Sequence, residues 1–264
     1  MSPGLFMHYL RLRMKERMEY RGAFLIGVGS QMLGYAASYL VIWLTLLRFE
    51  EIGGWNWPEI AFLYSLNVLT YALGAAFTYS PMLALEQMVQ KGTFDPILIR
   101  PLNPYLTLTA QMFNVGYLGH IILSGSILVW AVGHVDVTWT IARVVFLVLS
   151  IIGGTFIQAA ALTLIGAWSF TQVRTDVVTW FYHTMRDFQN YPVSIFGATM
   201  QILLTTVVPL AFANFYPAMI LLEKDSGAVP FNIGWLSPLI GPLVFGLAYL
   251  AWKRGMNRYQ GAGG

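Results

Sequence analysis

Long apolar runs are the feature that most limits what this chain can fold into. At a rise of 1.5 Å per residue, a helix of roughly 20 residues crosses about 30 Å of hydrocarbon. The runs are continuously apolar, whereas the strands of a membrane barrel alternate between polar and apolar positions. Because hydrocarbon offers backbone groups no partners, each run is expected to be helical. The sequence predicts an all-α integral membrane protein with six transmembrane helices, at approximately 23–47, 60–80, 107–132, 139–167, 194–214 and 235–252.

The composition excludes several other classes of protein. Hydrophobic residues make up 57% of the 264 residues and charged residues only 10%, whereas soluble domains carry about 25% charged residues. The chain has no cysteine, which excludes disulfides, thiol catalysis and zinc–thiolate sites. Its net charge of +3 is too small to indicate a nucleic-acid partner.

The distribution of Lys and Arg predicts the orientation. Six spans place both termini and the segments 81–106 and 168–193 on one side, which holds twelve of the 15 basic residues. The other side holds Arg48, Arg143 and Lys224. Because cytoplasmic loops are enriched in Lys and Arg, both termini of this multi-pass protein are expected in the cytoplasm.

The basic segment 1–22 precedes the first apolar run. Leu5, Phe6, Tyr9 and Leu10 can share one helical face, with most of the basic residues on the other. This pattern is typical of an amphipathic helix that lies in the cytoplasmic interface and contacts membrane lipid. The alternative is a basic tail that only fixes topology.

The segment 81–106 has the chemistry of a stiff elbow. A short helix can end at Gly92, which tolerates the left-handed conformation found at helix ends. Asp95 stands where an N-cap is expected and Pro96 at a first helical position, while Pro101 prevents that second helix from continuing. Such a loop can transmit movement from a partner, or it can be a rigid hairpin that only spaces two spans.

Residues 92–102 (GTFDPILIRPL) resemble the G-x-x-D-x-L-L-x-R-P-L signature between spans two and three of ABC-2-type transporter permeases. Residues 191–193 (YPV) and 208–218 (VPLAFANFYPA) are similar to the segments that enter and leave span five in one branch of that family, whose permeases have about this length and are often encoded in pairs beside one ATPase.

The resemblance implies a transmembrane permease subunit of an ATP-driven ABC exporter, without enzymatic activity of its own. It implies a separate ABC ATPase as partner and a second permease half, either a copy of this chain or a related permease. It also implies the bacterial plasma (inner) membrane as the location, and an external re-entrant segment at 215–230. A plain external loop over these residues is the alternative. The chain lacks a G-x-x-x-x-G-K-[ST] loop, so no cofactor is expected on it, and ATP and Mg are expected on the partner. The residues expected to couple to the ATPase are Glu86, Lys91, Phe94, Asp95, Pro96, Arg100 and Pro101.

Polar residues inside the apolar runs are candidates for a substrate path, because polar groups are costly in a membrane. They can equally bond neighbouring helices. The pair at 111 and 114 is three residues apart and is expected on one helical face. Arg143 is a weaker candidate for recognising an anionic substrate, because it can also extend to the interface. The candidates for the path are Asn67, Gln111, Asn114, Gln158 and Gln201.

No catalytic or metal-binding pattern accompanies these candidates. The four histidines are scattered without an H-E-x-x-H companion, and no G-x-S-x-G elbow is present. The apolar and aromatic composition suits a lipid-like, drug-like or other amphipathic substrate. An ATP-independent channel or carrier remains the alternative, although no Asp or Glu lies at the centre of any span to carry protons.

The expected organisation is a single transmembrane domain over 1–264. Its parts are an interfacial helix (1–22), spans one and two (23–80), the cytoplasmic coupling elbow (81–106), spans three and four (107–167), a cytoplasmic loop (168–193), spans five and six with the external segment (194–252), and a cytoplasmic tail (253–264).

Overall fold

The structure, a computed structural model, describes residues 2–172, 174–224, 228 and 230–260. Within these ranges the regular secondary structure is helical, apart from one antiparallel bridge between Ile52 and Trp55. The expected helical membrane architecture is confirmed, with five helical segments long and apolar enough to span a membrane where six were expected. They are α2 (Arg21–Phe49), α3 (Trp57–Gln90), Val115–Val132, which contains α6 (Leu118–Val132), α7 (Ile141–Trp168), and Phe231–Arg258, which contains α11 (Ser237–Arg258).

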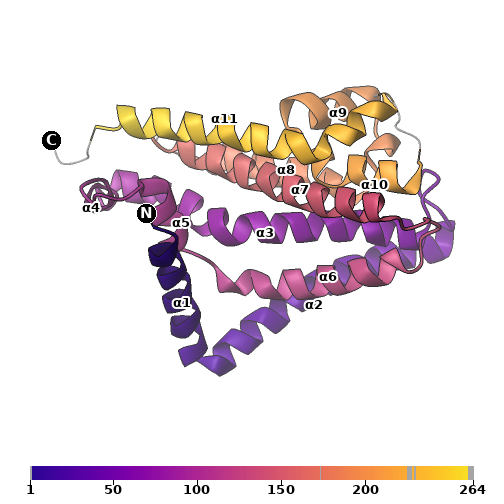
Figure 1. Cartoon of the computed structure of the whole chain (residues 1–264), viewed down its shortest axis with the longest axis horizontal. Helices are drawn as coiled ribbons and strands as arrows, with labels where there is room; N and C mark the ends of the chain where they lie inside the picture. The colour runs from indigo at the N-terminus through magenta and orange to yellow at the C-terminus, as the bar shows by residue number, and fades with distance from the viewer. Residues whose placement is uncertain (1, 173, 225–227, 229, 261–264) are drawn as a thin grey trace.

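The long helices lie side by side (Figure 1). Helix α7 packs between α11 and α3, α6 packs on α3, and α2 packs on α6. We call the end that holds residues 91–103 the elbow end; α1 begins and α11 ends there (Figure 1). We call the opposite end, with residues 50–56 and 133–140, the distal end.

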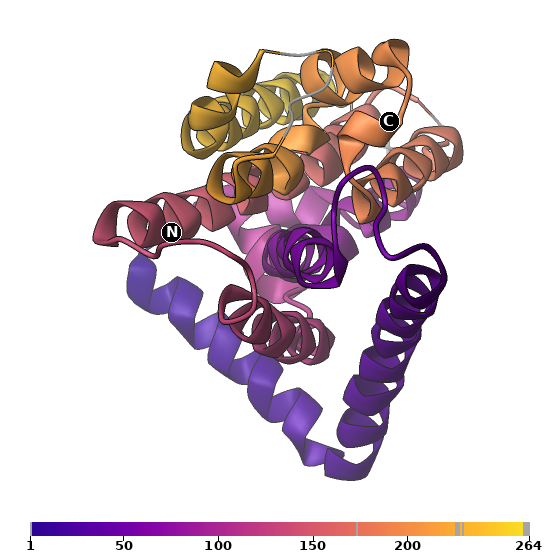
Figure 2. The same ribbon diagram turned by 90° about the vertical axis from the view of Figure 1, so that its right-hand side faces the viewer.

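Helix α1 (Pro3–Glu19) lies crosswise to the long helices, and with α2 it forms a V (Figures 1 and 2). Phe6 stacks on Phe77 at 6.4 Å between ring centroids, and the Arg13 side chain donates to the Gln111 carbonyl. These contacts hold α1 against the elbow end. Its position in a membrane interface stays a prediction.

Glycines bring α7 and α11 into backbone contact. A Cβ atom at Gly241 would lie 1.9 Å from the carbonyl oxygen of Gly153, and a Cβ at Gly153 would lie 2.6 Å from the Ser237 carbonyl oxygen. Such close approach is possible only without side chains, as at many membrane helix interfaces.

A capping box begins α3 at the distal end. The Asn56 side chain accepts from the Glu59 backbone N–H at 3.2 Å, and the Glu59 carboxylate accepts from the Asn56 backbone N–H at 2.9 Å. The same carboxylate pairs with Lys224 at 2.8 Å. Two of the N–H groups that the helix start leaves without helical partners are thereby satisfied.

Helix α3 continues into the elbow, so the separate helix expected after Pro81 does not form. Pro81 is accommodated inside α3, whose 34 residues give a length of about 51 Å, more than the roughly 30 Å of a hydrocarbon core. The helix ends, as predicted, before Gly92, which has a φ of +67°. The helix is therefore too long to lie wholly within the hydrocarbon if it stands upright in the membrane.

The elbow is fixed to the bundle by Phe94. Its ring is fully buried and packs against Phe170, Trp252 and Tyr259 at centroid distances of 5.5, 6.5 and 6.0 Å. Helix α4 (Asp95–Leu98) follows it, so Asp95 is the first helical residue rather than the expected cap. The elbow is thus a short helix on an aromatic base.

The helix expected over 107–132 is broken. Helix α5 (Pro104–Gln111) stops, a 3-10 helix (Val115–Tyr117) follows, and α6 begins at Leu118. Asn114 makes the break: its backbone N–H donates to Ala76, and its side chain accepts from the Gly116 N–H, both at 2.9 Å. Asn favours such turns because its side chain bonds nearby backbone. Gln111 and Asn114 therefore do not share a helical face.

The prediction of a loop over 168–193 is wrong for most of this segment. Helix α8 (Asp176–Asp187) and the 3-10 helices Phe188–Asn190 and Val193–Ile195 run along α3. Thr175 bonds Glu86 near the elbow end, Asn190 bonds Asn67, and Ile195 packs against Gly53 at the distal end. This stretch traverses the bundle.

The span expected over 194–214 is not one helix either. It divides into α9 (Ala198–Ile202), a π-helix (Leu203–Val207) and a 3-10 helix (Leu210–Ala213), and α10 (Phe215–Leu222) follows. Pro209 interrupts it, since proline cannot continue a helix. The chain enters the bundle from the distal end and reverses direction beside Gln189. It then returns to the distal end at Glu223, beside Arg143. We call 198–222 the re-entrant hairpin; it begins earlier than the expected 215–230, of which 225–227 and 229 lie outside the described residues.

Replacing Gly241 with Ala should lower the thermal unfolding midpoint of the detergent-purified protein, because the new methyl group would overlap the Gly153 backbone. Overpacking of this kind costs about 1–3 kcal/mol. Gly246 on the same helix has no atom within 4 Å of its Cβ position, so Gly246→Ala is the matched control and should be neutral or stabilising. Equal midpoints for the two variants would contradict the contact.

Candidate functional site

An amide network lies inside the bundle, between α3, α7, α8 and the re-entrant hairpin. Gln158 donates to the Gln189 side-chain oxygen at 3.2 Å and accepts from the Tyr182 hydroxyl at 2.9 Å. Gln158 and Gln189 are fully buried. A buried polar network is retained only where its members satisfy one another.

The network also closes the tip of the re-entrant hairpin. Gln189 donates to the Leu210 carbonyl at 2.7 Å and to the Asn214 side chain at 3.3 Å. Asn214 donates to the carbonyls of Gln189 and Leu63 at 2.8 and 3.4 Å. The Leu210 carbonyl lies at a turn inside an apolar bundle, and the Gln189 amide supplies its partner. Asn214 in turn ties the hairpin to Gln189 and to α3.

The structure divides the five predicted path residues. Asn67 donates to Asn190 at 3.0 Å, so it and Gln158 face the interior around α8. Gln111 and Asn114 lie at the break between α5 and α6, nearer the elbow end. Gln201 bonds the Ser194 and Phe196 carbonyls on the distal side. The five do not form one site, and their role in a path stays a prediction.

Arg186 lies on α8 between two members of this network, about one turn after Tyr182 and one turn before Gln189. Its guanidinium carbon is 3.5 Å from the centroid of the Tyr71 ring, and it donates to the Tyr35 hydroxyl at 3.3 Å. The charge distribution predicted a cytoplasmic loop for the segment that contains Arg186. Arg186, Tyr182 and Gln189 were not predicted as interior residues, because hydropathy does not identify α8 as part of the bundle.

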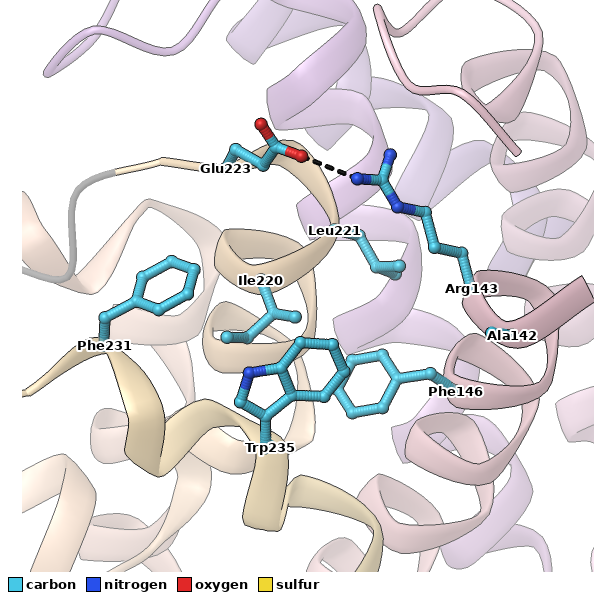
Figure 3. A pocket seen from close by; sticks show the side chains of 8 residues that line it. All are labelled: Ala142, Arg143, Phe146, Ile220, Leu221, Glu223, Phe231 and Trp235. Carbon is cyan, nitrogen blue, oxygen red and sulfur yellow. Dashed lines mark hydrogen bonds and ion pairs between the residues drawn. The ribbon is translucent and has the colours of Figure 1, made fainter. Parts of the chain in front are cut away.

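A pocket of about 460 Å³ opens at the distal end between α7, α10 and the segment that precedes α11 (Figure 3). Phe146 and Trp235 form its wall, 4.8 Å apart between centroids. Arg143 and Glu223 close its rim with an ion pair at 2.6 Å (Figure 3). The pocket is therefore an apolar space whose one cation is neutralised.

The structure separates the seven predicted coupling residues: four are exposed on the elbow, two lie beneath its surface and one points away from it. Lys91, Pro96, Arg100 and Pro101 are exposed on the elbow, where the side chain of Ile99 is 85% exposed. Phe94 is buried beneath them, and Asp95 is partly buried with one carboxylate oxygen enclosed. Glu86 points away from the elbow surface and accepts from the backbone N–H of Thr175 at 2.8 Å and from its hydroxyl.

No three His, Asp or Glu side chains of the described residues gather as metal ligands do. The family model described as "ABC-2 family transporter protein" matches residues 32–263. No curated protein and no solved structure matches the chain.

Gln189→Leu should lower the thermal unfolding midpoint, because it leaves the Leu210 carbonyl and the Asn214 amide group short of partners. Each unsatisfied buried group costs about 1–3 kcal/mol. The matched control is Gln172→Leu, since Gln172 is exposed. If both variants unfold at the wild-type temperature, the network does not hold the hairpin.

Proposed function

The chain belongs to the ABC-2 family of transporter proteins and is a transmembrane subunit of an ABC transporter; from this premise we propose that it exports an amphipathic substrate, driven by a separate ATPase that docks on the elbow. ATP and Mg bind that ATPase, and this chain carries no cofactor. The elbow lies in the cytoplasm together with both termini, and the membrane is the bacterial inner membrane.

The shape of the elbow is the observation that carries this proposal. Exposed Ile99 stands beside exposed Arg100, with Lys91 at the preceding bend. An exposed apolar side chain next to an arginine suits a groove on a soluble partner, because Arg is enriched among the buried residues that contribute most of the binding energy at interfaces. A hairpin that only spaces two helices does not require an exposed isoleucine on a base fixed by Phe94.

Glu86 supplies a route from the elbow into the membrane. It lies on the part of α3 that continues into the elbow, and its carboxylate holds Thr175 at the start of α8. Helix α8 in turn leads to Gln189, which bonds the tip of the re-entrant hairpin. A displacement of the elbow is expected to reach the interior network along this path.

The apolar faces of α2 and α8 fit contact with lipid and with a second permease half. Leu33 and Leu40 on α2 are exposed, as are Val177 and Trp180 on α8. The partner is a copy of this chain or a related permease. The apolar pocket of Figure 3 fits the acyl or aromatic part of an amphipathic substrate at the distal end.

Arg100→Glu should reduce the amount of ATPase that co-purifies with the tagged chain at least tenfold, because reversing a charge at a docking surface costs more than about 1.4 kcal/mol. Arg48→Glu is the control, since Arg48 is exposed at the end of α2 near the distal end. Full recovery of the ATPase with Arg100→Glu would refute docking at the elbow.

Glu86→Ala should leave the ATPase bound but lower transport per ATP hydrolysed in proteoliposomes, because the contact with α8 is lost. Thr175→Val removes one of the same bonds and should have a smaller effect. Combining the two should cost no more than Glu86→Ala alone, as for residues that act through one contact. Additive losses would place Glu86 and Thr175 on separate routes.

A further inference from the structure

Arg186 differs from the cations of the bundle that form ion pairs. Arg13, Arg143 and Lys224 form ion pairs with carboxylates, at 2.7, 2.6 and 2.8 Å. No carboxylate among the described residues lies within 4.0 Å of Arg186. An unpaired cation inside a membrane bundle is costly and is a functional candidate for that reason.

Aromatic groups surround this cation without neutralising it. The Tyr71 ring lies over the guanidinium, and the Tyr35 hydroxyl accepts one of its hydrogen bonds. Cation–π contacts attract a guanidinium but leave its charge intact. The Arg186 Nε is buried and donates to no group among the described residues. The guanidinium therefore keeps both a net charge and a free donor.

His120 approaches the same place from α6. Its side chain is 6% exposed, and its Nδ1 has no hydrogen-bond partner among the described residues. The His120 ring packs edge-on against the Tyr35 ring, 4.5 Å between centroids. Tyr35 is thus flanked by two buried nitrogens without partners, one from His120 and one from Arg186.

A groove begins one helical turn further toward the distal end. Its volume is about 280 Å³, and it lies between α2, α3 and the residues after α8. Ser38 in its wall follows Tyr35 by three positions, and Asn190 follows Arg186 by four. Val41 and Tyr64 make its walls largely apolar. The charged cluster and the apolar groove are therefore adjacent.

We propose that Arg186, Tyr35 and His120 bind the anionic head group, a carboxylate or a phosphate, of the exported substrate, and that the neighbouring groove takes its apolar part. An anion would accept from the free Nε of Arg186 and from His120, in the charge-assisted hydrogen bonds that Arg forms best. The inference rests on the proposed function and narrows its substrate class from amphipathic to anionic amphipathic.

The pocket of Figure 3 is the natural comparison. Its Arg143 is paired with Glu223 and also donates to Thr138. An anion at that pocket would have to displace a carboxylate. Arg143→Gln is therefore the matched control for Arg186→Gln.

Binding of radiolabelled dodecyl phosphate to the full chain in neutral detergent tests the proposal without the ATPase. We expect saturable binding to the wild type, at least tenfold weaker binding to Arg186→Gln, several-fold weaker binding to His120→Gln, and unchanged binding to Arg143→Gln. Arg186→Lys should be intermediate, because Lys keeps the charge but loses the planar donor geometry. The thermal unfolding midpoint of each variant distinguishes a loss of binding from a loss of fold.

Competing ligands distinguish the contribution of the head-group site from that of the groove. Dodecanoate should displace dodecyl phosphate, whereas dodecanol should not, because it lacks the charge. Inorganic phosphate at the same concentration should displace it poorly, because it lacks the chain. Equal binding by wild type and Arg186→Gln, or equal competition by dodecanol, would overturn the head-group site, and equal competition by inorganic phosphate would overturn the groove.

The source of the anion is tested in the complex with the ATPase. If dodecyl phosphate behaves as a transported substrate, adding it should raise the rate of ATP hydrolysis. Arg186→Gln should abolish this rise. Binding without stimulation, in a complex whose ATPase docks normally, would indicate a resident lipid and overturn the substrate role while leaving the proposed function intact. Loss of ATPase docking to the elbow would refute the proposed function whatever the binding result.

Discussion

The structure depends on satisfying a chain reversal inside an apolar bundle. The re-entrant hairpin turns where neither water nor a continuous helix can bond its carbonyl groups, and an unsatisfied group there is costly. Gln189 supplies a partner for the Leu210 carbonyl, and Asn214 at the turn donates to the carbonyls of Gln189 and Leu63. This arrangement sets the depth of the hairpin and the path of α8, because Gln189 must lie at the level of Leu210. It also ties α7 to both through Gln158.

The parts that local chemistry decides could be predicted from the sequence. Apolar runs gave α2, α3, α7 and α11, and Gly92 and Pro96 marked the bend and the short helix of the elbow. The path of α8 could not be predicted in this way. Its sequence contains Asp176, His183 and Arg186, which hydropathy assigns to water, and it is held in the bundle by contacts with residues far away in the chain. The breaks at Asn114 and Pro209 were visible as residue types, but their consequences depend on what packs beside them.

Charge is placed differently at the ends of the bundle and in its interior. At the distal end, Arg143 and Lys224 are neutralised by neighbouring carboxylates, and the elbow exposes its cations. Arg186 has no carboxylate partner among the described residues, and its guanidinium contacts the Tyr71 ring and the Tyr35 hydroxyl. Helix α8 carries Arg186 and begins at Thr175, which Glu86 holds. Under the proposed function, the helix that receives movement from the elbow is therefore the helix that holds the head-group site.

The glycine contacts have a mechanical consequence. Gly241 meets the Gly153 backbone, and a Cβ at Gly74 would lie 2.8 Å from the carbonyl oxygen of Thr155. Helices joined at backbone distance cannot slide past one another without first separating, so α3, α7 and α11 form a stiff frame. The helices α1 and α2 share little buried surface with it. Any rearrangement in this subunit must therefore move α3, α7 and α11 together, whereas α1 and α2 are less firmly attached to them.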